Sequence, residues 1–285
     1  MHKIAVLGGG RIPFQPSGTI YKQLSNFDLI HYTMQSLLQK TQIDPKEIDS
    51  IYIGNVIQEV TTSNVAREAA LQAGIPAHVP ATTISQACIS SSQCVSLGMA
   101  QIQSNQAQLV MVGGVETFSD VPIKYPKHMR QWLIDLPKIT KKGILPTLSY
   151  VSKLNPTYFT PQPPALANFT TGELMGTTSE KIAKRFGISR QEQDTFSIRS
   201  HQYAYNAHQR GYYNDEIFPY EDSSIEHNIR SNIHMDQLSK LKPSFKKGGT
   251  HSAGNSSGLT DGATCSFIAT EEKAKQLQIP PLAYI

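Results

Sequence analysis

The sequence predicts an α/β fold, and three observations lead to that prediction. Apolar runs without polar alternation, typical of strands buried on both faces of a sheet, occur at Ile4–Leu7, Ile51–Ile57 and Leu109–Val115. Helical patterns separate or follow these runs at Asp28–Lys40, Asn64–Ala73 and Cys88–Gln103. Alternation of strand and helix is typical of α/β proteins. The length of 285 residues suits one large domain or two interleaved ones.

The α/β pattern is interrupted at Pro122 and resumes near residue 251. Between residues 122 and 153 there are seven lysines and arginines but a single acidic residue, Asp135, and four prolines. Such a long excursion is not a simple loop. We therefore predict three parts: residues 1–121 as the first part of an α/β domain, 122–250 as an inserted loop or lid domain, and 251–285 as the return to the sheet.

Two helices are predicted within the insertion from capping-box patterns. Thr177–Glu180 and Ser189–Glu192 both carry a hydroxyl residue followed three positions later by glutamate, and Gly187 and Gly211 are the expected stops. After a glycine- and serine-rich stretch, Ala263–Ala269 is predicted to be a strand and Glu271–Gln278 a helix.

Composition limits the classes of function. The formal net charge of +4 is too small to indicate nucleic-acid binding, and the three cysteines show neither a disulfide framework nor the paired spacing of a metal site. The first apolar run is too short for a signal peptide, and no run is long enough to span a membrane. We therefore expect a cytoplasmic protein. The basic stretch Lys124–Lys153 is either a solvated loop, which we favour, or a contact for a phosphorylated cofactor or an anionic membrane.

Two glycine-containing motifs are interpreted as structural. Gly8–Gly10 lacks the third glycine of a dinucleotide-binding turn, because position 13 is proline, and a tight turn that ends a strand is the better interpretation. Gly254–Gly258 matches the GxSxG pattern of serine hydrolases but lacks the flanking strand and helix. We expect it to be a wall that lets backbone approach a ligand closely.

Cys88 is the strongest candidate for a catalytic residue. It lies where a predicted strand, Thr82–Ile84, leads into a helix whose inward stripe is predicted as Ser91, Val95, Met99 and Ile102. The positive end of the helix dipole favours the thiolate, which is the nucleophilic form of cysteine. A buried structural cysteine fits the position equally well. Cys94 and Cys265 are expected to be core residues.

Taken together, these segments resemble the thiolase family, most closely the 3-ketoacyl-CoA thiolases found as β subunits of trifunctional complexes. The matching segments are Gly10–Phe14, Asn64–Arg67, Ala87–Ser90, Gly113–Asp120, Met175–Glu180, Gln191–Asp194, Lys240–Pro243 and Ala253–Gly262. The resemblance identifies Cys88 as the acyl-accepting cysteine. It places Arg230 against the nucleotide end of coenzyme A, and Met175, Ala253, Ser257 and Gly258 around pantetheine and the acyl chain.

The resemblance also implies a fold. It is the N-terminal half of the thiolase fold, a five-stranded mixed sheet with helices on both faces and an inserted lid. The histidine and cysteine motifs of the family's second half do not occur in this sequence, so we expect the C-terminal half to be absent and the chain alone to be inactive or weak.

The implied activity is that of a transferase, an acetyl-CoA C-acyltransferase of fatty-acid β-oxidation and lipid metabolism, which works by ping-pong acyl transfer through a cysteine thioester. Coenzyme A is a co-substrate and no cofactor or metal is permanently bound. The expected partners are acyl-CoA, further copies of the chain, a C-terminal half-thiolase chain, a hydratase/dehydrogenase α subunit and, through the lid, a membrane surface. The alternative is a catalytically incomplete half-thiolase that serves as a coenzyme A binding or assembly module.

Overall fold

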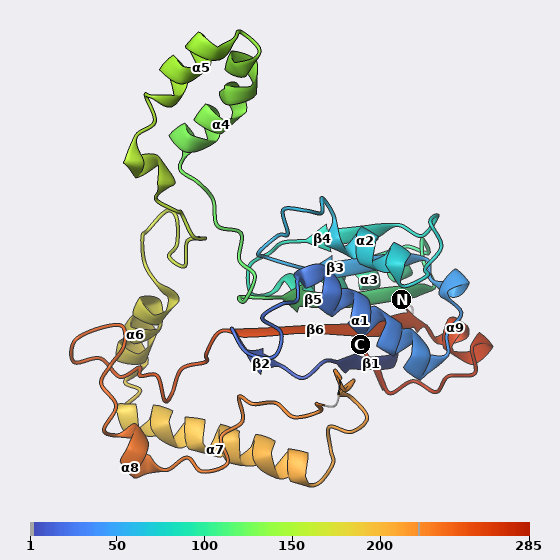
Figure 1. Ribbon diagram of the computed structural model, residues 1–285. Helices are drawn as coiled ribbons and strands as arrows, with labels where there is room; N and C mark the ends of the chain where they lie inside the picture. Colours follow the sequence, from blue (N-terminus) through green and yellow to red (C-terminus); the bar gives the residue numbers. More distant parts are fainter. Residues whose placement is uncertain (1–2, 222) are drawn as a thin grey trace. The chain divides into compact units, whose positions relative to one another are not determined.

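The computed structural model describes residues 3–221 and 223–285, and its central feature is a mixed β-sheet (Figure 1). The strand order within these residues is β4-β3-β5-β6-β1-β7, and β2 pairs with β6. The strands are β1 (Ile4–Arg11), β2 (Gln15–Pro16), β3 (Ser50–Gly54), β4 (Ala81–Ile84), β5 (Leu109–Glu116), β6 (Thr260–Thr270) and β7 (Ala283–Tyr284). β3 runs parallel to β4 and β5, whereas β6 is antiparallel to β5 and β1. The five longest strands correspond to the predicted five-stranded mixed sheet, and β2 and β7 add two strands of two residues each.

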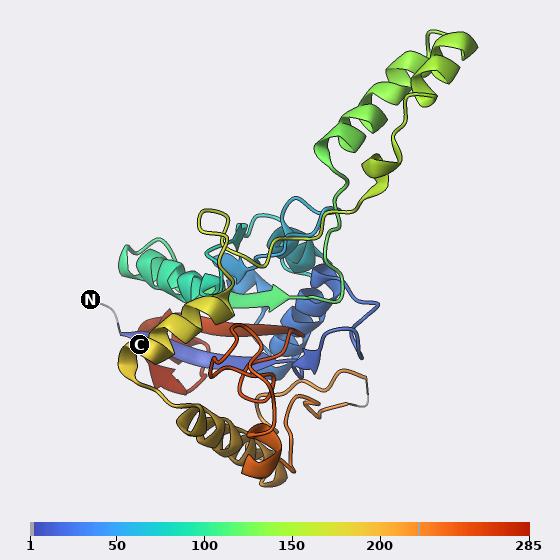
Figure 2. The same cartoon turned by 90° about the vertical axis from the view of Figure 1, so that its left-hand side faces the viewer.

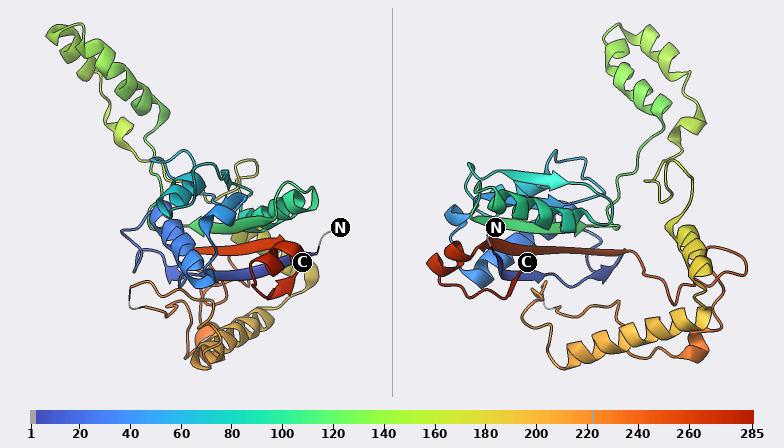
Figure 3. Two further views of the ribbon diagram at one scale, coloured as in Figure 1. Left: turned by 90° about the vertical axis from the view of Figure 1, so that its right-hand side faces the viewer. Right: turned by 180° about the vertical axis from the view of Figure 1, so that it is seen from behind.

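Helices cover both faces of this sheet, as predicted. α1 (Asn26–Thr41) and α2 (Val65–Gln72) pack on one face, where Leu29, Met34 and Val65 join a core with the β3 residues Ile51 and Ile53. α3 (Ser90–Gln103) packs on the opposite face, where Cys94 and Ile102 meet Val110 and Val112 of β5. Figure 1 shows the face of α1 and α2, and the right panel of Figure 3 shows that of α3. Because strand side chains alternate between faces, one continuous apolar run serves both cores.

The buried side of α3 differs from the predicted stripe. Its buried residues are Ser90, Cys94, Gly98 and Ile102, whereas Ser91, Val95 and Met99 are only half-buried or exposed. The helix can approach the sheet closely at Gly98, where an added Cβ would lie 2.8 Å from Ile268 Cδ1. The closest approach, rather than the largest apolar side chains, therefore decides which side of α3 faces the sheet.

The chain leaves the sheet after β5 and returns to the neighbouring position with β6. The helices of the intervening segment are α4 (Lys127–Thr140), α5 (Ile144–Val151), η2 (Pro156–Phe159), α6 (Met175–Phe186), α7 (Arg190–Gln209) and α8 (Met235–Leu238). The remaining helices are η1 (Pro45–Glu47), before β3, and α9 (Glu271–Gln276), after β6. One compact unit contains the chain up to Asp120 together with Ala167–Ile285, and a second comprises Val121–Leu166. The boundaries 122 and 250 of an inserted domain stay a prediction.

The second unit, Val121–Leu166, is a pair of helices followed by a short 3-10 turn. α4 and α5 pack against each other (Figure 2), and the rings of Trp132 and Tyr150 stack with centroids 5.4 Å apart. Their outer surface carries large apolar side chains, including Ile144 and Leu145, which are 78% and 80% exposed. Within the described residues, no helix has the length and apolar character needed to cross a membrane.

Local predictions from helix caps and glycines have mixed outcomes. Ser189 caps α7 and forms the predicted capping box with Glu192, and Gly187 ends α6 in the left-handed conformation. The capping box predicted at Thr177 is wrong, because the N-cap of α6 is Leu174, three residues earlier. The turn predicted at Gly8–Gly10 is also wrong: all three glycines lie inside β1.

The glycines of β1 make room for neighbouring side chains. An added Cβ on Gly10 would lie 2.1 Å from the ring of Phe218, and one on Gly8 would lie 2.8 Å from Thr41 Cγ2. Gly254–Gly258, in contrast, is irregular and leads directly into β6 at Thr260, as expected for a segment that is not a nucleophile elbow.

Candidate active site

Cys88 lies on a tight turn between β4 and α3. The turn is closed by hydrogen bonds from Ile89 N to Gln86 O (3.3 Å) and from Ser90 N to Ala87 O (3.2 Å), and Ala87 has a left-handed φ of 47°. The Ser90 hydroxyl accepts from Gln86 N at 2.8 Å and donates to Ala87 O at 2.6 Å. Cys88 is exposed, two residues before the first residue of α3. The predicted helix-terminal cysteine is therefore on a turn that presents its thiol to solvent.

The other two cysteines are unsuited to nucleophilic chemistry. Cys94 and Cys265 are fully buried, one in α3 and the other in β6. Burial raises the pKa of Cys94 to about 11 and raises the pKa of Cys265 as well. Both thiols therefore stay protonated near neutral pH, which confirms the prediction that they are core residues.

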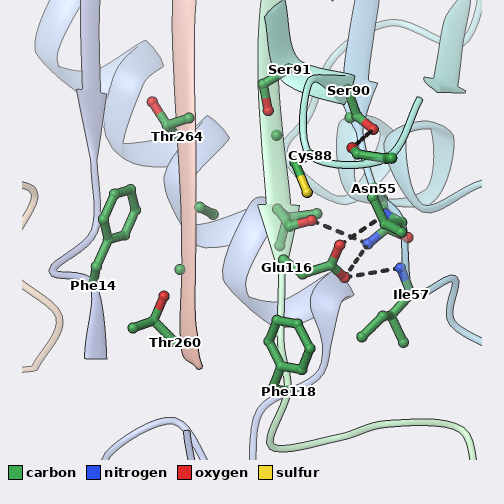
Figure 4. Close-up of a pocket in the computed structure, with 17 residues that line it drawn as sticks. Phe14, Asn55, Ile57, Cys88, Ser90, Ser91, Glu116, Phe118, Thr260 and Thr264 are labelled. Carbon is green, nitrogen blue, oxygen red and sulfur yellow. Dashed lines mark hydrogen bonds between the residues drawn. The ribbon is translucent and has the colours of Figure 1, made fainter. Parts of the chain in front are cut away.

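Cys88 lines a pocket of about 420 Å³ (Figure 4). The wall is mostly apolar and comes from distant parts of the chain: Phe14 follows β1, Val56 and Ile57 follow β3, and Phe118 follows β5. The other lining residues are Gly54, Asn55, Ala87, Ser90, Ser91, Gly114, Val115, Glu116, Thr260, Gly262, Ala263 and Thr264. Among these residues, only Cys88 and Glu116 have ionisable side chains. The pocket is suited to an apolar group attached to a thiol.

Two glycines allow the start of α3 to approach the sheet beside this pocket. An added Cβ on Gly54 would lie 2.6 Å from Ser91 N and 2.7 Å from Ser90 C. One on Gly114 would lie 1.9 Å from Ser91 Oγ. The space that a side chain would need is occupied by the helix backbone at Gly54 and by the Ser91 side chain at Gly114.

Glu116 forms the polar part of the pocket wall. Its carboxylate accepts hydrogen bonds from Val56 N (2.9 Å), Ile57 N (3.1 Å) and Asn55 Nδ2 (3.1 Å), as Figure 4 shows. Burial raises the pKa of Glu116, and these three hydrogen bonds oppose that shift without cancelling it. Sequence reasoning did not single out Glu116 or Asn55, although Glu116 lies within the segment Gly113–Asp120 that carries the family resemblance.

A second buried carboxylate, Asp261, holds the segment that follows β5. It is fully buried and accepts from Phe118 N (2.7 Å), Thr117 Oγ1 (3.1 Å) and Ser119 N (3.2 Å). The Ser119 hydroxyl also donates to Asp261. Asp261 thereby fixes the backbone that places the Phe118 ring in the pocket wall, a role that sequence reasoning missed.

None of the five predicted coenzyme A contacts lines the Cys88 pocket. Met175 begins α6 and is 52% exposed, and Ala253, Ser257 and Gly258 lie on the irregular loop before β6. Arg230 is exposed, and its backbone N–H donates to His201 Nδ1 at 3.2 Å. Exposed side chains are available to a ligand, but the assignment of these residues to a lid and to coenzyme A stays a prediction.

The loop that contains Ala253 and Ser257 is anchored by two buried carboxylates. Glu180 of α6 accepts from Thr250 N and His251 N, each at 2.9 Å. Asp194 of α7 accepts from Asn255 Nδ2 at 2.8 Å and from Arg190 Nε at 2.8 Å. Burial alone would raise the pKa of Glu180, but the hydrogen bonds from His251 and Thr250 outweigh it and lower that pKa.

Comparison with known proteins identifies the family. The thiolase family, by its N-terminal domain, matches residues 4–272, and the chain belongs to that family. The mouse mitochondrial trifunctional enzyme subunit beta is 42% identical over the whole chain, a probable 3-ketoacyl-CoA thiolase of Caenorhabditis elegans is 38% identical, and a 3-ketoacyl-CoA thiolase of Yersinia enterocolitica is 36% identical. The chain spans 60% of the length of the mouse protein and 64% of that of the nematode protein.

Solved structures agree with this assignment. Human mitochondrial 3-ketoacyl-CoA thiolase in complex with CoA has a TM-score of 0.84 at 30% identity, and the match covers all of this chain and 68% of that one. Acetyl-CoA acetyltransferase of Bacillus anthracis gives the same TM-score and identity, with 70% of its chain covered. The predicted fold, the N-terminal part of the thiolase fold, is confirmed.

Proposed function

We propose that this chain carries the acyl-accepting site of an acetyl-CoA C-acyltransferase of the 3-ketoacyl-CoA thiolase type, acting in fatty-acid β-oxidation with coenzyme A as co-substrate. The observation that supports it most is the placement of Cys88. Of the three cysteines, all within the described residues, it alone is exposed, and it lines an apolar pocket. The names of the relatives, which include 3-ketoacyl-CoA thiolases, agree with this activity.

In the proposed reaction, the Cys88 thiolate attacks the 3-keto carbon of a 3-ketoacyl-CoA. The bond between C2 and C3 breaks, its electron pair stays on C2, and C2 takes up a proton to leave as acetyl-CoA. The thiolate of coenzyme A then attacks the Cys88 thioester, which releases the shortened acyl-CoA and regenerates the Cys88 thiolate. A sulfur nucleophile is needed because the carbon–carbon cleavage proceeds as two successive acyl transfers.

The proton for C2 must come from beyond the pocket wall described here. Besides Cys88, the lining residues include one ionisable group, Glu116, and its carboxylate already accepts three hydrogen bonds. The residues of this pocket therefore bind the acyl group and supply the nucleophile. The proton donor and the general base come from other groups, and loss of either typically lowers the rate by about 10²-fold or more.

The half-reaction at Cys88 tests this proposal. The chain is mixed with a 3-ketoacyl-CoA, released acetyl-CoA is quantified, and the cysteine peptides are mapped by mass spectrometry, with Cys88→Ala as the control. We expect one acyl group on the Cys88 peptide and one equivalent of released acetyl-CoA, formed slowly by the chain alone and rapidly when the groups of a C-terminal part are supplied. The measurement is repeated with the C-terminal part of a relative added. Acyl transfer retained by Cys88→Ala, or an acyl group on another residue, would contradict the proposal.

We further propose that the unit Val121–Leu166 contacts an anionic membrane surface. Its helices expose large apolar side chains, and the segment 122–153 carries seven basic residues against Asp135. Apolar side chains combined with positive charge favour binding at an interface. Co-sedimentation with vesicles of anionic lipid, but not with vesicles of zwitterionic lipid, is expected. Leu145→Asp should weaken it, and equal binding of both vesicle types would refute the electrostatic part.

The assembly proposals concern further protein chains. β4 is an edge strand whose residues are only partly buried, and such edges pair readily with another chain, so we propose a homo-oligomer. A hydratase/dehydrogenase α subunit is proposed because the mouse relative is named a trifunctional enzyme subunit. Sedimentation at several concentrations tests self-association, and a dilution-resistant monomer would contradict it. The cytoplasmic location likewise stays a proposal, to be tested by cell fractionation.

A further inference from the structure

One part of the wall of the Cys88 pocket is a loop, Asn55–Ile57, that has no regular secondary structure. Core packing holds this loop only in part: Val56 is 43% exposed, whereas Asn55 is buried. Its backbone position therefore depends mainly on hydrogen bonds. Asn55 N donates to Ile84 O at 2.9 Å, and Ile57 O accepts from Asn26 Nδ2 at 2.8 Å.

The remaining backbone donors of the loop converge on one carboxylate. β3 and β5 are parallel with Gly54 beside Gly114, so Glu116, two residues further along, lies beside Val56. Glu116 Oε2 accepts from Val56 N, and Oε1 accepts from both Ile57 N and Asn55 Nδ2. Both oxygens are thus occupied by donors. An amide cannot reproduce this arrangement, because its NH2 group would face a donor in place of one oxygen.

We propose that Glu116 is a positioning residue that sets the width of the Cys88 pocket and so selects among acyl groups by size. The selection of acyl groups rests on the proposed function. Glu116 acts through the backbone of Val56 and Ile57, which line the pocket together with Phe14 and Phe118. Loss of the hydrogen bonds to Glu116 lets the loop carry Val56 and Ile57 away from Cys88, and the pocket then admits larger groups.

The test compares two neutral probes of Cys88 that differ only in the length of the alkyl group, N-methylmaleimide and N-hexylmaleimide. Rates of modification at one pH are measured by mass spectrometry for the 285-residue chain, Glu116→Gln and Glu116→Asp. Glu59→Gln is the matched control, because Glu59 accepts from Val60 N and Thr61 N but does not line the pocket. A change in local charge alters the Cys88 thiolate fraction equally for both probes, so the ratio of the two rates reports pocket shape.

We expect Glu116→Gln to raise the hexyl-to-methyl ratio about fivefold or more, since differences of a few methylenes are discriminated strongly in a well-defined apolar pocket. Glu116→Asp should restore part of the original ratio, and Glu59→Gln should leave it unchanged. An unchanged ratio in folded Glu116→Gln overturns the proposal. If that variant does not fold, Val56→Ala decides: its side chain is partly exposed, and an unchanged ratio there overturns the proposal equally.

The proposed function is assessed separately by transfer of acetyl and longer acyl groups from their coenzyme A esters to Cys88. Maleimide modification needs no coenzyme A chemistry. Absence of acyl transfer in the unmodified chain, measured with the C-terminal part of a relative added, would therefore count against the thiolase proposal alone. Acyl transfer with the same chain-length preference in Glu116→Gln as in the unmodified chain would count against Glu116 alone.

Discussion

Gly54→Ala perturbs the contact between the end of β3 and the start of α3, which carries Cys88. The new Cβ would lie 2.6 Å from Ser91 N, 2.7 Å from Ser90 C and 2.8 Å from Ser90 Cβ. The first two atoms are backbone and cannot rotate away. To move from 2.6 Å to the 3.4 Å of an ordinary contact, strand and helix must separate by about 0.8 Å.

Two consequences of that separation can be measured. Overpacking of this kind costs about 1–3 kcal/mol of the free energy of unfolding. A displacement near 1 Å of a catalytic group lowers its rate by up to about 10²-fold. We therefore expect Gly54→Ala to lower the urea midpoint and to slow the acylation of Cys88 more than the loss of stability alone accounts for.

The assay combines urea unfolding with the rate of Cys88 acylation in conditions where each variant is folded. Leu37→Ala is the matched control, because Leu37 is fully buried on the opposite face of the sheet. It should lose about 2–5 kcal/mol of stability while Cys88 reacts at the original rate. Gly54→Ala with the original midpoint and rate would refute the argument that glycine is required here for close approach.

Three further predictions concern charge and reactivity. In brief iodoacetamide treatment, Cys88 should be the only cysteine modified rapidly, because the thiols of Cys94 and Cys265 are buried and have raised pKa values; peptide mapping that finds either of them first would contradict this. Arg230→Ala should weaken coenzyme A binding about tenfold at low salt and less at high salt; an unchanged affinity in calorimetry would remove the assignment. Because the pKa of Glu180 is lowered in the folded state, its stabilising contribution is present above about pH 4.5 and is lost as the pH falls through its folded-state pKa. The difference in urea midpoint between Glu180→Gln and the unmodified chain should therefore shrink on acidification below pH 4.5. A difference that does not depend on pH would contradict this prediction.

The two predicted capping boxes show where local rules are sufficient. Ser189 and Glu192 complete their capping box, and helix α7 begins there. At Thr177 the same pattern fails because the expected capping glutamate, Glu180, accepts hydrogen bonds from Thr250 and His251 instead. A residue seventy positions away thus competes for the carboxylate, and no local pattern contains that information.

The prediction of a turn at Gly8–Gly10 was wrong for a related reason. Consecutive glycines usually indicate a turn, since glycine adopts conformations that other residues avoid. Here the backbone is an ordinary strand, and the missing side chain at Gly10 leaves space for the ring of Phe218. The reason for the glycine is a neighbour from another part of the chain.

The alternation of strands and helices in the sheet-forming parts, the burial of Cys94 and Cys265 and the place of Cys88 before a helix could be derived from the sequence. These features depend on periodicity and on neighbours close in the chain, which are visible in one dimension. The stretch Lys124–Lys153, which we favoured as a solvated loop, instead contains the helices α4 and α5, and only the structure showed that Cys88 is exposed. The wall of the Cys88 pocket could not be derived, because Phe14, Val56, Glu116 and Thr260 come together only when β1, β3, β5 and β6 form one sheet. The tertiary structure also decided that Glu116 holds the loop after β3, since parallel strand pairing alone sets Glu116 beside the backbone donors of Val56 and Ile57.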